Sequence, residues 1–326
     1  MIRFLMKTNT SITVLGAGVS GLTTGIVLAE NGYDVQIITK DLPHETTSAV
    51  AAAIWFPYEA YPEDKVSRWS SESFQVFEQL AKISESGVSF ILFTAYLDTF
   101  EKPWWLEALP ESHLLNDWEK SPVNEHHRGY KMNVPLMETP IYLKYLLRRF
   151  LIAGGDVSQK EINRLAELNS DQLIINCTGL GARYLFDDKH VFPIQGQVLK
   201  VEPDADISGI STEYPMGEHG DEMAYIIPRR DCIVLGGSAR KHEFTMTPDE
   251  ELTERIIKYC ASFQPKIEGL NVLETTVGLR PGRSEIRVEK DPHLPVIHNY
   301  GHGGAGYTVS WGCAHEVLNI LQNDLG

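Results

Sequence analysis

Three features that this sequence lacks narrow its class. No uninterrupted apolar run reaches about 18 residues, the length that a membrane-spanning helix requires. Basic residues number 29 against 44 acidic ones, and the net charge of −15 disfavours nucleic acid or an anionic membrane as a partner. Cysteine is scarce, and its positions show neither metal-ligand nor disulfide-framework spacing: Cys177, Cys232, Cys260 and Cys313. We therefore expect a cytoplasmic protein with reduced cysteines and no metal.

What the chain does contain is a glycine-rich turn near its beginning. The strand-favouring stretch 11–15 leads into Gly16-x-Gly18-x-x-Gly21, a helical pattern follows up to Gly32, and a second strand is predicted at 34–39. The first glycine permits a tight turn, the second lets a pyrophosphate approach, and the third lets helix and strand pack closely. This order predicts a dinucleotide site at the helix N-terminus, formed by Gly16, Ala17, Gly18, Val19, Ser20 and Gly21.

The end of the second predicted strand departs from the usual pattern. A carboxylate that holds the ribose hydroxyls is expected about 20 residues after the glycines, but the chain reads Thr39-Lys40-Asp41. In one interpretation Asp41 reaches the ribose. In the other, Lys40 lies along the phosphates or the adenosine edge, and both interpretations stay open.

A run of small residues, 46–53, then leads into the aromatic cluster Trp55-Phe56-Pro57-Tyr58. Small side chains allow the backbone to approach a flat ring or another backbone closely. A tight helical turn in the core explains the run equally well.

The chain has 326 residues, which is long enough for one large or two medium domains. Along it, segments predicted to bind a nucleotide alternate with β-rich segments. Helices are predicted at 63–83, at 139–153 with Thr139 as the cap, at 249–262, and from Trp311 onward. A hairpin is predicted around Arg229-Arg230-Asp231. We predict an α/β fold, with a Rossmann-like domain at 1–59, 139–197 and 266–326, and an inserted β-rich α+β substrate domain at 60–138 and 198–265.

Further motifs stand in a fixed order along nearly the whole chain. After the first glycine motif come Trp55-Phe56-Pro57, Asn176-Cys177-Thr178-Gly179, Gly196-Gln197, Tyr225-Ile226-Ile227-Pro228, Gly278-Leu279-Arg280-Pro281, and His298-Asn299-Tyr300-Gly301-His302-Gly303-Gly304 with Trp311-Gly312. Together they resemble the FAD-dependent D-amino-acid oxidases and their sister group, the D-aspartate oxidases. The second glycine-rich stretch suits FAD, because the isoalloxazine lies remote from the pyrophosphate and requires its own backbone donors.

The resemblance implies a non-covalently bound FAD. In this family the turn 303–308 lines the flavin, and Thr308 matches the position that contacts the pyrimidine carbonyl. A helix that begins there would stabilise the anionic reduced flavin with its positive end. Beyond the first glycine motif, the expected cofactor residues are Thr39, Lys40, Asp41, Thr46, Thr47, Ala52, Ala53, Val157, Cys177, Thr178, Gly179, Gly303, Gly304, Ala305, Gly306, Tyr307 and Thr308.

The resemblance also implies the chemistry. The Arg280 guanidinium would grip the substrate α-carboxylate bidentately, with a further bond from Tyr225, while the Gly304 carbonyl accepts from the amine. Arg283 and Arg287 are the nearby alternatives, but the family pattern selects Arg280. Such positioning aims the Cα–H at flavin N5 for hydride transfer. The imino acid then hydrolyses to a 2-oxo acid and ammonia, and oxygen is reduced to hydrogen peroxide.

Substrate choice depends on the side-chain end of the pocket, where we expect Phe56 and Tyr214. The family's second active-site tyrosine has Asp221 in its place, and Tyr214 would substitute for it from an acidic lid, 213–222. This lid offers no cation for a second carboxylate. We therefore expect neutral or apolar D-amino acids to be favoured, with basic ones accepted.

Other functions remain as alternatives. They are a D-aspartate oxidase, a glycine- or sarcosine-type flavin amine oxidase, a non-catalytic FAD-binding protein and an NAD-dependent dehydrogenase. Small-molecule D-amino acid and oxygen are the expected partners, and a homodimer is left open.

Overall fold

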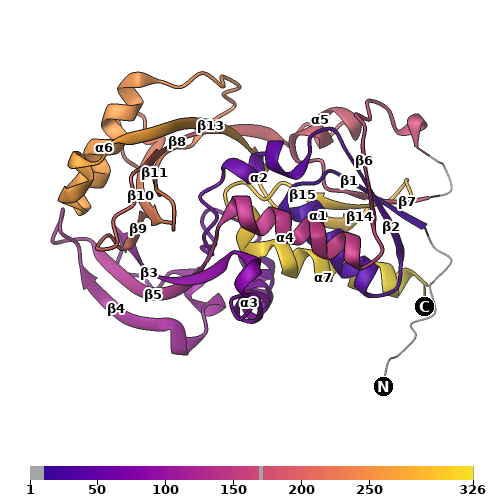
Figure 1. Ribbon diagram of the computed structural model, residues 1–326, viewed down its shortest axis with the longest axis horizontal. Coiled ribbons are helices and arrows are strands. Elements are labelled where there is room, and N and C mark those ends of the chain that lie inside the picture. Colours follow the sequence, from indigo (N-terminus) through magenta and orange to yellow (C-terminus); the bar gives the residue numbers. More distant parts are fainter. Residues whose placement is uncertain (1–10, 169–171, 326) are drawn as a thin grey trace.

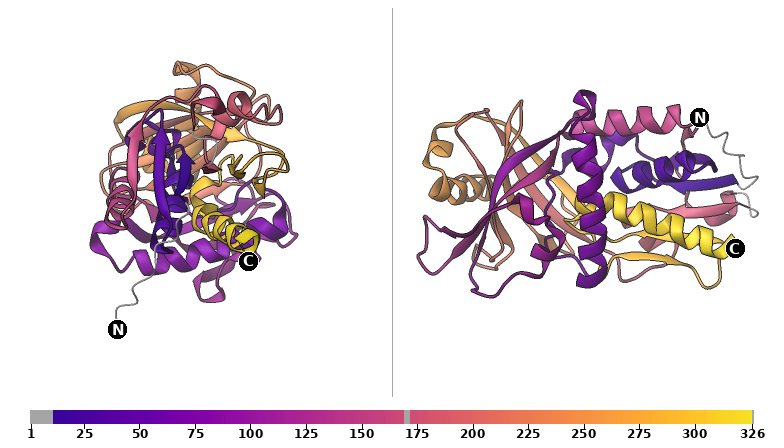
Figure 2. Two further views of the ribbon diagram at one scale, coloured as in Figure 1. Left: turned by 90° about the vertical axis from the view of Figure 1, so that its right-hand side faces the viewer. Right: turned by 90° about the horizontal axis from the view of Figure 1, so that it is seen from below.

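The protein, a computed structural model that describes residues 11–168 and 172–325, consists of two β-sheets side by side along its long axis, with helices packed around them (Figure 1). Helix α3 (Glu63–Leu80) stands at the boundary between the two halves and packs against the last helix, α7 (Gly306–Leu325) (Figure 2). The two sheets therefore meet along one seam, where segments from distant parts of the chain come together.

The first sheet has six strands in the order β14-β15-β7-β1-β2-β6. All neighbours pair in parallel except β14, which is antiparallel to β15. Helices α1 (Val19–Glu30), α4 (Thr139–Ile152) and α7 pack beside it, and α1 contacts both of the others. The strands are β1 (Ser11–Leu15), β2 (Asp34–Thr39), β6 (Asp156–Gln159), β7 (Leu173–Asn176), β14 (Arg287–Lys290) and β15 (Val296–Tyr300). This is the nucleotide-binding architecture that the glycine motif predicted.

The turn between β1 and α1 is closed by glycine for a steric reason. A Cβ on Gly21 would lie 1.9 Å from the Gly16 carbonyl oxygen, so no other residue fits there without moving the turn. The helix consequently begins directly over the end of β1. Its N-terminus opens at the carboxyl edge of the parallel strands, where ligands of such sheets bind.

The second sheet has nine strands in the order β12-β8-β11-β10-β9-β3-β5-β4, and β13 pairs with β8 as well. Helix α6 (Glu250–Phe263) packs on β10 and β11. The strands are β3 (Val88–Leu97), β4 (Leu114–Lys120), β5 (Arg128–Met137), β8 (Phe192–Val201), β9 (Gly209–Thr212), β10 (Glu222–Pro228), β11 (Ile233–Ser238), β12 (Arg240–Lys241) and β13 (Val272–Gly282). Two short helices complete the set, α2 (Thr47–Val50) and α5 (Ala182–Leu185). The division of the chain into two sequence-defined domains stays a prediction.

Most predicted elements are confirmed, and two boundaries were wrong. α3, α4, α6 and the β10–β11 hairpin stand where the patterns place them. However, α7 begins at Gly306 and not at Trp311, because its first turn is buried against the core and packing outweighs the low helix propensity of glycine. Thr139 lies inside α4, capped by Glu138, and its hydroxyl donates to the Ala49 carbonyl instead (3.0 Å).

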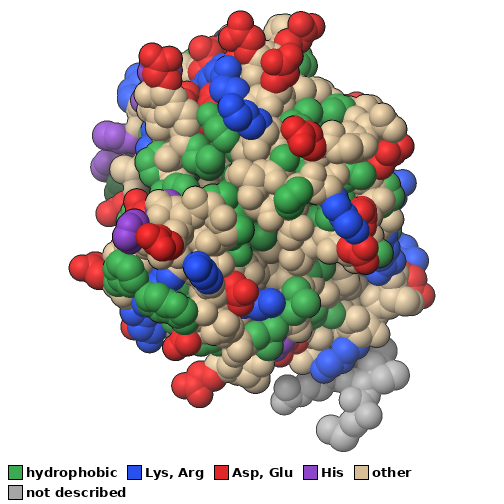
Figure 3. Space-filling model, turned by 90° about the vertical axis from the view of Figure 1, so that its left-hand side faces the viewer, with side chains coloured by type: hydrophobic (Ala, Val, Ile, Leu, Met, Phe, Trp, Pro, Cys, Tyr) green, Lys and Arg blue, Asp and Glu red, His purple; other side chains and the backbone are tan. Residues whose placement is uncertain are grey.

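The surface agrees with the acidic composition. At the end of the molecule that carries α6 and β4, acidic side chains are interspersed with hydrophobic and basic ones, and no broad basic patch forms on this face (Figure 3). Among residues 11–168 and 172–325, no helix is long and apolar enough to cross a membrane. All four cysteines are free.

Candidate active site

Two cavities meet at the seam between the sheets. The outer cleft, about 890 Å³, follows the carboxyl ends of β1, β2 and β7. The inner cavity, about 180 Å³, lies among strands of the second sheet. They share one stretch of wall, which consists of Thr47, Val50, Ala51, Gly278, Arg280, His302, Gly303, Gly304 and Tyr307. A ligand bound along the outer cleft therefore reaches the inner cavity past this shared wall.

The head of the outer cleft is built from backbone at the β1–α1 turn. The Ala17 amide donates to Thr39 Oγ1 (3.1 Å), and that hydroxyl donates to the Asp41 carbonyl (2.7 Å). The Val19 amide donates to Ser48 Oγ (3.0 Å), so the run of small residues is tied to the start of α1. These bonds fix the glycine turn and the first residue of α1, which line the head of the cleft where a pyrophosphate would meet the helix N-terminus.

Most of the predicted cofactor residues line one of the two cavities. In the outer cleft these are Gly16, Ala17, Gly18, Val19, Ser20, Thr39, Lys40, Asp41, Thr46, Thr47, Cys177, Thr178, Gly179, Gly303, Gly304, Gly306 and Tyr307, and in the inner cavity they include Ala52 and Ala53. Four others are not among the lining residues: Gly21, Val157, Ala305 and Thr308. The Thr308 hydroxyl instead binds backbone, accepting from Phe56 N and donating to Phe56 O (both 3.0 Å).

The end of the cleft beside β2 holds an ion pair. Lys40 Nζ lies 2.8 Å from Glu161, and this hydrogen bond raises the pKa of Lys40. Lys40 is thus occupied by a neighbouring carboxylate, while Asp41 lines the cleft beside it. Lys40 and Asp41 both line the cleft, so both remain candidates for the contact with a ribose.

Arg280 lies on β13 where the two cavities join. Its Nη1 donates to the Ser238 carbonyl (2.9 Å). On the neighbouring strand β8, a Cβ at position 196 would lie 2.2 Å from Arg280 Nη1, and Gly196 leaves that space free. The guanidinium is therefore held against two strands of the second sheet, with its position fixed before any ligand arrives.

Tyr225 stands beside it on β10. A Cβ at position 236 would lie 1.8 Å from the ring carbon that carries the hydroxyl, so Gly236 on β11 makes room for the ring. Burial raises the pKa of Tyr225, and the charge and hydrogen bond of Arg280 partly offset that rise. The hydroxyl consequently stays protonated near neutral pH and can donate to a carboxylate.

The two alternative arginines are engaged elsewhere. Arg283 lines the inner cavity, but its Nε donates to buried Asp188 (3.1 Å). Arg287 does not line either cavity, and it donates to the Tyr300 hydroxyl (2.8 Å) and to Glu289 (2.7 Å). Of these three arginines, Arg280 alone lines both cavities, and no carboxylate of the described residues forms a salt bridge with it.

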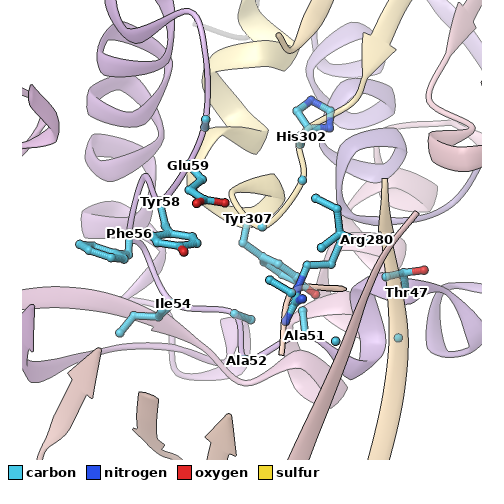
Figure 4. A pocket seen from close by; sticks show the side chains of 18 of the residues that line it. Thr47, Ala51, Ala52, Ile54, Phe56, Tyr58, Glu59, Arg280, His302 and Tyr307 are labelled. Atoms are coloured by element: carbon cyan, nitrogen blue, oxygen red, sulfur yellow. The ribbon is translucent and has the colours of Figure 1, made fainter. Parts of the chain in front are cut away.

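The far side of the inner cavity is largely apolar. Phe56 is buried there and packs against Phe93 and Trp105, with ring centroids 5.4 and 5.2 Å away. Figure 4 shows Arg280 facing the cavity from the side opposite Phe56, Tyr58 and Glu59. A ligand that places an anionic group on Arg280 therefore directs its other end toward aromatic side chains and one carboxylate.

No residue of the predicted acidic lid, 213–222, lines this cavity, although Glu213 lies near Trp105 and Glu59. The Tyr214 ring packs on His127, with centroids 4.2 Å apart, and is not a lining residue. Residues 216–222 form a small turn anchored where Glu222 accepts hydrogen bonds of 2.8 to 3.1 Å from Arg255 on α6. The structure thus does not bring Tyr214 to the lining of the inner cavity, and the turn that follows it is held by α6.

His302 belongs to the shared wall but is uncharged at neutral pH, with a proton on only one of its two ring nitrogens. Burial lowers its pKa to about 4. Its Nε2 lies 3.0 Å from Asn299 Oδ1 and its Nδ1 lies 3.4 Å from Ser20 Oγ. The ring thereby links the start of α1 to the segment before α7.

Several residues that line the two cavities were not predicted from the sequence as site residues. They are Ser48, Tyr58, Glu59, Phe93, Ser211 and Met223, together with the segment 160–163 and Tyr184 in the outer cleft. The run of small residues was a usable signal for Ser48. For 160–163, the expectation fell on Val157 in β6, but the loop after this strand, and not the strand, reaches the cleft.

Comparison with known proteins gives a consistent result. A family model described as FAD dependent oxidoreductase matches residues 11–320. The D-amino-acid oxidase of Rubrobacter xylanophilus is 40% identical over 94% of this chain and 94% of its own. That of Streptomyces coelicolor is 36% identical over 95% of this chain and 96% of its own. A D-aspartate oxidase from Homo sapiens is 30% identical over 95% and 94%.

Solved structures share the fold at low identity. Glycine oxidase from Geobacillus kaustophilus superposes with a TM-score of 0.78 at 15% identity, covering 97% of this chain and 95% of that one. L-proline dehydrogenase from P. horikoshii gives 0.77 at 16% identity, covering 98% and 95%. These likenesses concern the arrangement of the backbone alone.

Proposed function

The chain belongs to the FAD-dependent oxidoreductase family that includes the D-amino-acid oxidases, and on this premise we propose that it oxidises D-amino acids to 2-oxo acids, releasing ammonia and hydrogen peroxide. The family relationship makes FAD the cofactor. The observation that carries the proposal is the pair of Arg280 and Tyr225 at the inner end of a dinucleotide-sized cleft.

The residues present fit FAD. A cleft of about 890 Å³ is within the range of roughly 300–1,000 Å³ that small-molecule sites occupy. Gly18 and the N-terminus of α1 would hold the pyrophosphate, Lys40 or Asp41 would contact the ribose, and the shared wall would hold the ring non-covalently. When bound, FAD supplies an oxidised ring that accepts a hydride at N5 and passes the electrons to oxygen.

The protein's own contribution is positioning. The Arg280 guanidinium pairs with the substrate α-carboxylate, and the protonated Tyr225 hydroxyl donates to the same group. The Gly304 carbonyl on the shared wall accepts a hydrogen bond from the amine. The carboxylate is held by Arg280 and Tyr225, the amine by Gly304, and the side chain by the apolar part of the inner cavity. Fixing these three different substituents of Cα selects one handedness and holds the Cα–H in one direction.

The inner cavity supports a preference for neutral or apolar side chains. Its wall away from Arg280 includes Phe56, Tyr58 and Met223, and its second cation, Arg283, is paired with Asp188. A second substrate carboxylate would meet Glu59 there, so D-aspartate is disfavoured, although a human relative is a D-aspartate oxidase.

Hydrogen peroxide release across paired D- and L-amino acids tests the proposal. We expect peroxide with D-alanine, D-methionine and D-phenylalanine, little with D-aspartate, and none with the L-enantiomers. Release with glycine or sarcosine alone would favour a glycine-type oxidase. A yellow protein that yields no peroxide with any D-amino acid would be a non-catalytic FAD-binding protein.

Two wider assignments belong to the same proposal. We place the protein in the cytoplasm, since its four cysteines are free, and we propose a homodimer. Fractionation of cells and light scattering of the purified protein test these two points.

A further inference from the structure

The segment 48–52 contributes to both cavities, and side chains of other elements donate hydrogen bonds to its carbonyl groups. The Ser48 carbonyl accepts from the Tyr307 hydroxyl (2.7 Å). The Ala49 carbonyl accepts from Thr139 Oγ1 at the start of α4 (3.0 Å). The carbonyls of Ala51 and Ala52 both accept from Nη2 of Arg229, at 2.6 and 2.7 Å.

Arg229 reaches this segment from the second sheet. It stands directly after β10, in the turn of the β10–β11 hairpin, and only 9% of its surface is exposed. Its Nη1 also donates to Thr139 Oγ1 (3.2 Å). The same turn is fixed to α4, because the Arg230 amide donates to Glu138 Oε1 (3.1 Å).

Burying a guanidinium costs desolvation free energy, which its hydrogen bonds must offset if it is to stabilise a loop. Here the nearby carboxyl group, Glu138, is itself buried, and burial raises its pKa while the charge of Arg229 opposes that rise. The shortest bonds of Arg229 go to the two backbone carbonyls. The planar fork suits this task, since one donor group can serve two adjacent oxygen atoms.

The direction of the carbonyls determines the direction of the amides. In a trans peptide the C=O of one residue and the N–H of the next point in opposite directions. When Arg229 draws the Ala51 and Ala52 oxygens outward, the N–H groups of Ala52 and Ala53 turn the other way. Ala51, Ala52 and Ala53 all line the inner cavity.

We propose that Arg229 is a positioning residue for FAD, which holds segment 51–53 with its amide donors toward the cavity. The guanidinium also polarises the two peptide groups, which makes their N–H ends better partners for negative charge on a reduced ring. Because the same hairpin carries Tyr225 on β10, cofactor affinity and the substrate cavity are coupled through one turn.

Titration of FAD into apoprotein tests this, with flavin fluorescence as the signal and thermal unfolding of each apoprotein measured alongside. For Arg229→Ala we expect the Kd for FAD to rise about tenfold or more, since bonds to a charged donor are lost. Methylguanidinium should restore part of the affinity. Arg230→Ala is the matched control, because that exposed side chain lies on the same turn.

A second readout separates positioning from general support of the fold. In variants saturated with FAD, the flavin midpoint potential should fall for Arg229→Ala and stay unchanged for Arg230→Ala. Arg229→Lys keeps the charge but loses the fork, so intermediate values of Kd and potential are expected, and this variant replaces Arg229→Ala if the latter does not fold. A folded Arg229 variant with the parent's Kd and potential, or an equal loss in Arg230→Ala, overturns the proposal.

Discussion

The outer cleft and the inner cavity are built by opposite means. The cleft presents backbone from short, continuous turns at the ends of β1, β2 and β7. The inner cavity presents side chains from strands far apart in the sequence, such as Arg280 on β13 and Tyr225 on β10. A cofactor with many polar atoms is thus met by a local backbone motif, while a small substrate is met by groups that only folding brings together.

Glycine shows the same contrast. Gly21 allows two backbone segments to touch, with the Gly16 carbonyl where its Cβ would be. Gly196 and Gly236 instead leave space for two functional side chains, Arg280 and Tyr225. In the cleft a missing side chain shapes the main chain, and in the cavity it makes room for a neighbour.

The largest effect is expected for Arg280→Ala, which tests whether the inner cavity serves the substrate separately from the cofactor cleft. Loss of a buried ion pair with the α-carboxylate costs about 3–5 kcal/mol, so kcat/KM for D-amino acids should fall on the order of 10²–10⁴-fold. FAD content should stay at the parent level. Steady-state peroxide assays and the flavin absorbance give the two measurements, with Arg287→Ala as a control. Near-normal turnover would refute the role of Arg280.

On the other side of the comparison, Gly21→Ala should damage the cleft alone. Its Cβ would lie 1.9 Å from the Gly16 oxygen, and overpacking of this kind costs about 1–3 kcal/mol. We expect weaker FAD binding, measured by titration of apoprotein, and an unchanged KM once FAD saturates. Gly269→Ala is the control, since a Cβ there meets nothing within 4 Å. A rise in KM with unchanged FAD affinity would contradict the division.

Gly196→Ala should give the converse result. The added methyl group displaces the Arg280 guanidinium, and about 1.4 kcal/mol of lost carboxylate binding corresponds to a tenfold fall in kcat/KM. FAD affinity should change little. If FAD affinity falls more than substrate affinity in Gly196→Ala, the cofactor cleft and the substrate cavity do not act as separate sites. Stopped-flow reduction of the flavin by D-methionine measures the substrate effect directly.

A pH-dependent test concerns His302, which both cavities share. Burial lowers its pKa to about 4, against about 6.5 in an unfolded chain. As the pH falls from about 6.5 toward 4, the unfolded state binds the proton first, so the free energy of unfolding decreases by at most about 1.4 kcal/mol per pH unit. Urea unfolding at pH 7, 6 and 5 should show this slope in the parent apoprotein and a shallower one in His302→Gln. An identical slope in both would disprove it, and His126→Gln serves as the surface control.

Much of the outer cleft was predictable because its geometry is local. A strand, three spaced glycines and a helix fix the turn within about ten residues, and the hydrogen bonds of Ala17 and Val19 complete it. Arg280 and Tyr225 came from the order of motifs, and the structure brings them together as expected. The structure does not bring Tyr214 to the lining of the inner cavity, and nothing in residues 213–222 signals that Arg255 on α6 anchors the turn after it.

The sequence by itself therefore determined the nucleotide-binding unit, the family and the FAD cofactor. Only the tertiary structure decided which side chains face the substrate, because that depends on strand register. A register shift between Glu222 and Tyr225 breaks simple alternation along β10, and the partners of Tyr225 lie on β9 and β11. A turn is specified by its own residues, whereas the direction of a side chain in a sheet is settled by the strands beside it.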